Sequence, residues 1–88
     1  MAHVLARLKG VNYADIRRVL VADSTRHAEQ GLYLEHLWRN IDDANEILFL
    51  FWAGDIGHAR EFIDTIHARA LHENPQAKLP NMVFLEEE

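Results

Sequence analysis

Asp23 and His27 are the two side chains whose types and spacing best suit acid–base chemistry. Residues four apart on a helix lie on the same face, so the carboxylate can orient the imidazole and stabilise its charged form. The pair continues the apolar stripe of Tyr13, Ile16 and Leu20, which directs it toward a sheet rather than toward water. This arrangement predicts a general base with its orienting acid. The alternative is a capping or surface pair at a solvated helix end.

The six histidines do not form a recognisable metal motif. His58 and His67 fall on opposite sides of one predicted helix, and His67 and His72 are five residues apart, so neither pair converges on an ion. A site that joins His27 to His36 stays open as an alternative, and His27 is also a candidate axial ligand for haem. The chain has no cysteine, which excludes disulfides and thiolate zinc sites. We expect no metal and no cofactor.

Six elements have to position these side chains. Asn12 and Asp55 are typical N-caps, and each precedes apolar residues at helical spacing. Gly31 ends the first helix and Asn74-Pro75 ends the second. Short runs in which successive side chains alternate between two faces indicate strands. The expected elements are a strand at 3–9, a helix at 13–30, strands at 32–39 and 46–53, a helix between the Asp55 cap and Asn74, and a strand at 81–85. The acidic residues 86–88 are expected to fray.

The order β-α-β-β-α-β is the split βαβ arrangement. Right-handed crossovers place its strands in the spatial order 4-1-3-2, with both helices on one face of the sheet. We therefore expect an α+β fold, a ferredoxin-like two-layer sandwich with an antiparallel sheet. With 88 residues, the chain is long enough for one such domain over residues 1–88.

The predicted strand at 46–53 is apolar on both faces. Alternation directs one set of side chains to one face and a second set to the other: Ile47, Phe49 and Phe51 against Leu48, Leu50 and Trp52. The helices of a two-layer domain cover only one face of its sheet. We expect a second copy of the chain to cover the other face, which predicts a homodimer. In the strand before it, alternation places His36 on the same side as Leu34 and Trp38.

Composition excludes several classes of function. The net charge is −5, opposite in sign to that of most nucleic-acid binders and unfavourable at an anionic membrane surface. No apolar run approaches the ~20 residues that span a bilayer, and no secretory signal pattern opens the sequence. We expect a cytoplasmic protein with no nucleic-acid or membrane partner.

Two segments carry a family resemblance. The run from Leu37 to Phe51, followed by the segment from Asp55 to Ile63, resembles small dimeric α+β barrel proteins, among them antibiotic-biosynthesis-monooxygenase-like proteins. The shared pattern is an arginine, a turn with paired acids, an apolar strand, and a helix that opens with an acid. The resemblance implies a homodimer of facing sheets, with a small cleft between helices and sheet. It transfers no active-site residue, because the superfamily serves many functions.

Two other families share the strand order. Phe49 and Phe51 have the spacing of the base-stacking aromatics of an RNA-recognition motif, although Glu46 opens that strand and the net charge disfavours RNA. The loop from Arg7 to Tyr13 looks like the phosphate-binding loop of acylphosphatases. However, Ala14 stands where that family has its phosphate-binding arginine. We therefore interpret the aromatics as core residues and the glycine of the loop as a turn.

The sequence predicts a protein that binds a small hydrophobic ligand or serves as an oligomerisation module. The alternative is a cofactor-independent enzyme, similar to a monooxygenase or isomerase, with Asp23 as orienter and His27 as base. Six residues are candidates for ligand contacts: His36, Trp38, Arg39, Phe49, Phe51 and Trp52.

Overall fold

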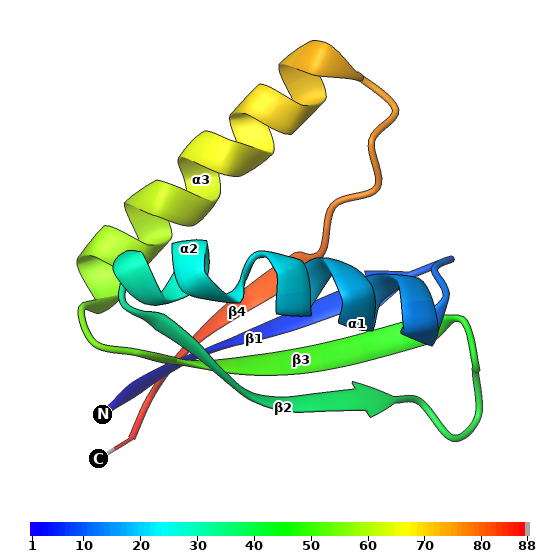
Figure 1. The fold of residues 1–88 in the computed structure, drawn as a ribbon, viewed down its shortest axis with the longest axis horizontal. Helices are drawn as coiled ribbons and strands as arrows, with labels where there is room; N and C mark the ends of the chain where they lie inside the picture. The colour runs from blue at the N-terminus through cyan, green and yellow to red at the C-terminus, as the bar shows by residue number, and fades with distance from the viewer. Residues whose placement is uncertain (88) are drawn as a thin grey trace.

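Four antiparallel strands form one sheet in the order β2-β3-β1-β4, which confirms the predicted topology read from the opposite edge. The computed structural model describes residues 1–87 of the chain. The helices lie on one side of the sheet (Figure 1). The elements are β1 (Ala2–Lys9), α1 (Tyr13–Ala22), α2 (Ser24–Glu29), β2 (Leu32–Arg39), β3 (Glu46–Ala53), α3 (Ile56–Glu73) and β4 (Asn81–Glu86).

The first predicted helix is two helices in the structure. Asn12 caps α1 as expected, and its Oδ1 accepts hydrogen bonds from the backbone N–H groups of Ala14 and Asp15 at 2.8 and 3.3 Å. The helix then breaks at Asp23, and α2 starts at Ser24. The break falls in the run Asp23-Ser24-Thr25. The side chains of Asp, Ser and Thr form local hydrogen bonds with the backbone, and these compete with the hydrogen bonds of a continuous helix. The Ser24 hydroxyl accordingly donates to the carbonyl of Val21 at 2.9 Å.

Helix α3 forms the second part of the covering layer and crosses the sheet at an angle to α1 and α2 (Figure 1). The Asp55 side chain accepts from the backbone N–H of His58 at 3.1 Å, which is the predicted N-cap. The helix ends at Glu73, next to the predicted stop at Asn74-Pro75. Within residues 1–87, none of the helices combines the length and apolar character needed to cross a bilayer.

The core lies between the helices and one face of the sheet. Strand β3 contributes every second residue to it, and β1 does the same, as the alternation predicts. Ile47 and Val4 are fully buried. The core is made of Val4, Ala6, Leu8, Leu20, Leu32, Ile47, Phe49, Phe51, Ala53, Ala59 and Ile63.

The opposite side of the sheet, called the open face below, carries the alternate residues of the same strands. Apolar and aromatic side chains dominate it, and Tyr33 packs against Trp52 with ring centroids 5.3 Å apart. The open face is formed by His3, Leu5, Arg7 and Lys9 of β1, Tyr33, Glu35, His36 and Trp38 of β2, Glu46, Leu48, Leu50 and Trp52 of β3, and Asn81, Val83 and Leu85 of β4.

A β-bulge in β2 changes which face its second half presents. Leu34 pairs with Phe51 on the helix side, whereas His36 pairs with Leu50 on the open face, so Glu35 is the extra residue. The prediction that Leu34 and His36 share a side was therefore wrong. A bulge shifts the alternation by one residue, and simple alternation does not anticipate it.

Strand β4 extends one residue further than predicted, to Glu86. The backbone N–H of Glu87 also donates to the carbonyl of Met1 at 2.8 Å, so these two acidic residues continue the pairing of β4 with β1. The third residue of the tail that was expected to fray, Glu88, lies outside the described residues.

Candidate functional site

An apolar cavity of about 150 Å³ lies between the helices and the covered face of the sheet. Its walls come from α1, α2, α3, β2, β3 and the start of β4. Two histidines, His27 and His67, are the only titratable residues that line it within the described part of the chain. The lining residues are Leu20, His27, Leu32, Phe49, Phe51, Phe62, Ile63, Ile66, His67, Pro80 and Met82.

His27 is half-buried and lies on α2 with its ring against the sheet. The imidazole meets the Phe51 ring edge to face, with centroids 5.4 Å apart. Burial lowers the pKa of His27 below its usual value, while the Asp23 carboxylate opposes this shift and the Arg26 guanidinium adds to it. At pH 7 the ring is therefore a neutral imidazole, which has a nitrogen lone pair available.

Asp23 lies at the break between α1 and α2. Its charge acts on His27, but among residues 1–87 the two side chains form neither a hydrogen bond nor an ion pair. The direct contact is between backbones, because the N–H of His27 donates to the Asp23 carbonyl at 2.9 Å. Asp23 and His27 are therefore neighbours, but the hydrogen bond by which the carboxylate would orient the imidazole is not formed.

His67 is the cavity residue that the sequence analysis missed. It was considered there only as a metal ligand, in relation to His58 and His72. In the structure it lies on α3 and lines the cavity, and burial lowers its pKa against the opposing charge of Asp64. The signal was present, since His67 follows Ile63 by four residues on the buried stripe of the helix.

The six candidate ligand residues do not form one site. Phe49 and Phe51 line the cavity, beneath the helices. His36 and Trp38 stack on each other on the open face, with centroids 4.8 Å apart, and Trp52 lies on that same face. Arg39 is on the helix side, where its guanidinium lies 5.6 Å from the ring centre of Tyr13.

The histidines are also dispersed with respect to metal binding. Within residues 1–87, no group of three or more His, Cys, Asp or Glu side chains converges on a point. His27 and His36 lie on opposite sides of the sheet, so they cannot bind one metal ion together, as the alternative in the sequence analysis required. His58 instead bonds to the side chain of Gln30 at 2.7 Å.

The structure also bears on the two related families. Phe49 and Phe51 are buried under the helices, so they cannot act as a stacking platform for bases. In the segment after β1, Val11 donates its N–H to the Asn45 carbonyl, and the first turn of α1 donates the N–H groups of Ala14 and Asp15 to Asn12. These three N–H groups are therefore not available to a phosphate.

We expect the two cavity histidines to make the protein less stable in mild acid. Because the unfolded chain binds these protons at a higher pH than the folded chain, the free energy of unfolding falls as the pH drops below about 6.5. Urea unfolding at pH 7, 6 and 5 measures this slope, and proton NMR of the imidazole rings gives the two pKa values. The double variant His27→Gln/His67→Gln should show a smaller slope. An NMR pKa at or above 6.5 for both rings would contradict the burial described above.

A search of protein-family models and a search of curated proteins both returned no match. Solved structures do match. One is a Deinococcus radiodurans protein provisionally described as an antibiotic biosynthesis monooxygenase, with 15% sequence identity and a TM-score of 0.65 over 100% of this chain and 93% of that chain. Another is an uncharacterised NIPSNAP domain protein from Burkholderia xenovorans, with 14% identity and a TM-score of 0.60 over 100% and 95%.

Both neighbours belong to the dimeric α+β barrel superfamily of ferredoxin-like proteins. This chain has the ferredoxin-like α+β fold of these two neighbours. The match covers its full length, so the resemblance first indicated by the Leu37–Phe51 and Asp55–Ile63 segments is confirmed at the level of the fold. In both neighbours the identity is low, and the likeness therefore concerns the arrangement of helices and strands.

Proposed function

We propose that this protein is a homodimer, paired through the open face, in which each subunit binds a small hydrophobic ligand in the cavity between helices and sheet. The observation that carries the ligand proposal is the apolar cavity of about 150 Å³ with two histidines on its walls. An engineered apolar cavity of about this size stays dry and binds benzene, so a single aromatic ring matches the available volume.

The open face supports the dimer. Tyr33, Trp38, Val83 and Leu85 each remain more than two-fifths exposed there. They lie on the two edge strands, β2 and β4, on either side of Leu48, Leu50 and Leu5. Large exposed apolar patches on a small protein mark interaction sites. A two-fold pairing would bury the same patch on both copies, which makes the patch its own partner.

The ligand proposal predicts that toluene binds in the cavity and that a larger side chain there blocks it. Replacing Ile66, which lines the cavity, by Trp fills the volume and is expected to weaken toluene binding at least about tenfold. Methyl and ring NMR signals of the cavity residues report the binding. The matched control is Leu71→Trp, since Leu71 is exposed on the same helix. If Ile66→Trp binds toluene as well as the parent chain, the ligand lies elsewhere.

A second candidate function is cofactor-independent proton abstraction with His27 as the base and Asp23 as its neighbour. The observation that favours it is the neutral, half-buried imidazole on the wall of an apolar cavity. In such a step a C–H proton of the ligand moves to a ring nitrogen of His27 and leaves an enolate. Monooxygenase-like and isomerase-like reactions can both begin in this way.

This second function predicts faster exchange of the methyl protons of acetophenone with D₂O in the presence of the protein. His27→Gln should reduce the protein-dependent rate about a hundredfold, and Asp23→Asn should reduce it less. Proton NMR follows the exchange directly. The control His72→Gln changes an exposed histidine at the end of α3 and should leave the rate unchanged. Equal rates for His27→Gln and the parent chain would leave ligand binding as the function.

A further inference from the structure

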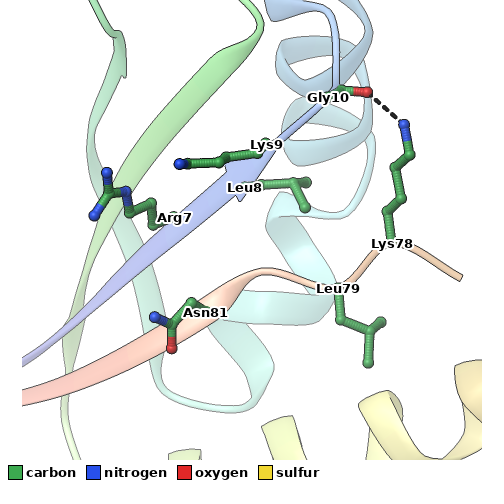
Figure 2. Close-up of a pocket in the computed structure, with 7 residues that line it drawn as sticks. All are labelled: Arg7, Leu8, Lys9, Gly10, Lys78, Leu79 and Asn81. Carbon is green, nitrogen blue, oxygen red and sulfur yellow. Dashed lines mark hydrogen bonds between the residues drawn. The ribbon is translucent and has the colours of Figure 1, made fainter.

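A second hollow, of about 570 Å³, lies where β1 ends and the chain enters β4 (Figure 2). We call it the basic hollow. Both lysines of the chain line it, and none of its lining residues is acidic, although the whole chain has a net charge of −5. It is lined by Arg7, Leu8, Lys9, Gly10, Lys78, Leu79 and Asn81.

One buried carboxylate, that of Glu46, partly neutralises the cations of the hollow. Arg7 binds it through Nε at 3.0 Å and through a second guanidinium nitrogen at 3.3 Å, and the amide of Asn40 donates to it at 2.7 Å. These hydrogen bonds hold the pKa of Glu46 below its usual value. Lys9 lies at 3.6 Å, so it forms an ion pair without a short hydrogen bond, and its side chain stays 69% exposed. Arg7 and Lys9 thus share this one carboxylate, whereas Lys78 forms no ion pair within residues 1–87.

Lys78 is held at the rim of the hollow by the backbone of Gly10. Its Nζ donates to the Gly10 carbonyl at 2.8 Å, as Figure 2 shows, and two further N–H donors of the ammonium group remain available. Gly10 has a φ of +73°, and a Cβ there would lie 2.9 Å from Nζ. Glycine therefore both forms this turn and leaves the room that the lysine occupies.

Apolar and neutral polar groups complete the hollow. Leu8 belongs to the core, and Leu79 precedes β4 by two residues, so the two leucines provide an apolar wall. Asn81 pairs with Arg7 across the strands, which places its amide beside the guanidinium on the open face. Cationic donors around an apolar wall suit a ligand that has a charged oxygen group and a small hydrocarbon part.

We propose that the basic hollow binds a small organic anion at the end of the sheet, with its oxygens on the two free donors of Lys78 and its apolar part on Leu8 and Leu79. Lys9 adds positive charge from the side of the open face. The hollow is separate from the histidine cavity, although the two share a wall. Lys78, Leu79 and Asn81 line the hollow, whereas Pro80 and Met82 line the cavity.

Three probes test this assignment: benzoate, acetate and inorganic phosphate, each titrated at constant ionic strength and followed by backbone amide NMR. We expect saturable benzoate shifts concentrated at residues 7–10 and 78–81, and acetate binding about tenfold weaker because it lacks the ring. Lys78→Met should weaken benzoate about tenfold, and Lys9→Met should weaken it less because Lys9 acts through its charge alone. Arg17→Met removes one positive charge from an exposed site on α1 and should change nothing.

Several results would overturn the proposal. The absence of a saturable shift with all three anions would remove the site. An equal loss of affinity in Arg17→Met would mean that the anion responds to net charge alone. Phosphate binding more tightly than benzoate would exclude an organic anion as the ligand. Benzoate shifts centred on His27, Phe51 and His67 would assign the probe to the apolar cavity instead.

Discussion

Replacing Leu50 by Asp is expected to convert the proposed homodimer into a folded monomer. Leu50 lies in the middle of β3 on the open face, where pairing would bury it against the partner. An unpaired carboxylate in an apolar interface costs at least about 4 kcal/mol, and two-fold symmetry places two of them in each dimer. The dissociation constant should therefore rise at least about a thousandfold.

Analytical ultracentrifugation over a range of protein concentrations measures this change, and circular dichroism confirms that the variant is folded. Leu71→Asp is the matched control, because Leu71 is 43% exposed on α3, away from the open face. It should sediment as the parent chain does. If Leu50→Asp sediments as a dimer, the copies do not pair through this face of the sheet. If the parent chain is itself a monomer at all concentrations, the homodimer is excluded.

Replacing Ile47 by Ala should lower the free energy of unfolding by about 2–5 kcal/mol. Ile47 is fully buried, and it pairs with Leu8 of β1 and Arg39 of β2, so truncating its side chain opens a cavity in the core between sheet and helices. For a domain of this size, that is a large part of the total stability. Urea unfolding followed by tryptophan fluorescence measures the difference.

Ile41→Ala is the matched control for this substitution. Ile41 is 100% exposed in the turn between β2 and β3, so the same chemical change should alter stability by less than about 0.5 kcal/mol. A similar loss in both variants would mean that Ile47 does not face the core. That outcome would contradict the strand register on which the description of both faces depends.

The strands and caps could be predicted because their signals are local. Strands 32–39 and 46–53 have the predicted bounds, since apolar runs end there at clusters of turn-forming residues. Asn12 and Asp55 cap their helices through hydrogen bonds that depend only on the neighbouring N–H groups. The sheet order followed from the chirality of the crossovers and needed no detailed packing.

The candidate site was less predictable because it depends on contacts between distant elements. His36 and Trp38 point away from the cavity because of one extra residue in β2, and the sequence carries no clear mark of that bulge. The break at Asp23 separates α1 from α2 and leaves the Asp23 carboxylate without a hydrogen bond to His27. His27 could be placed against the sheet from its spacing, and the spacing after Ile63 gives the same signal for His67. That the two rings line one cavity follows only from the packing of α3 over β3 and the start of β4.

The two ends of the described chain meet. Strands β1 and β4 are antiparallel neighbours, and the hydrogen bond from Glu87 to Met1 closes their shared end, so both termini lie at one corner (Figure 1). A short linker could therefore join them, with new ends opened among the exposed residues 41–45. In such a circular permutant each strand would keep its neighbours in the sheet, and the apolar cavity and the basic hollow would both be retained. The architecture thus depends on which strands are adjacent, and much less on the point at which the polypeptide begins.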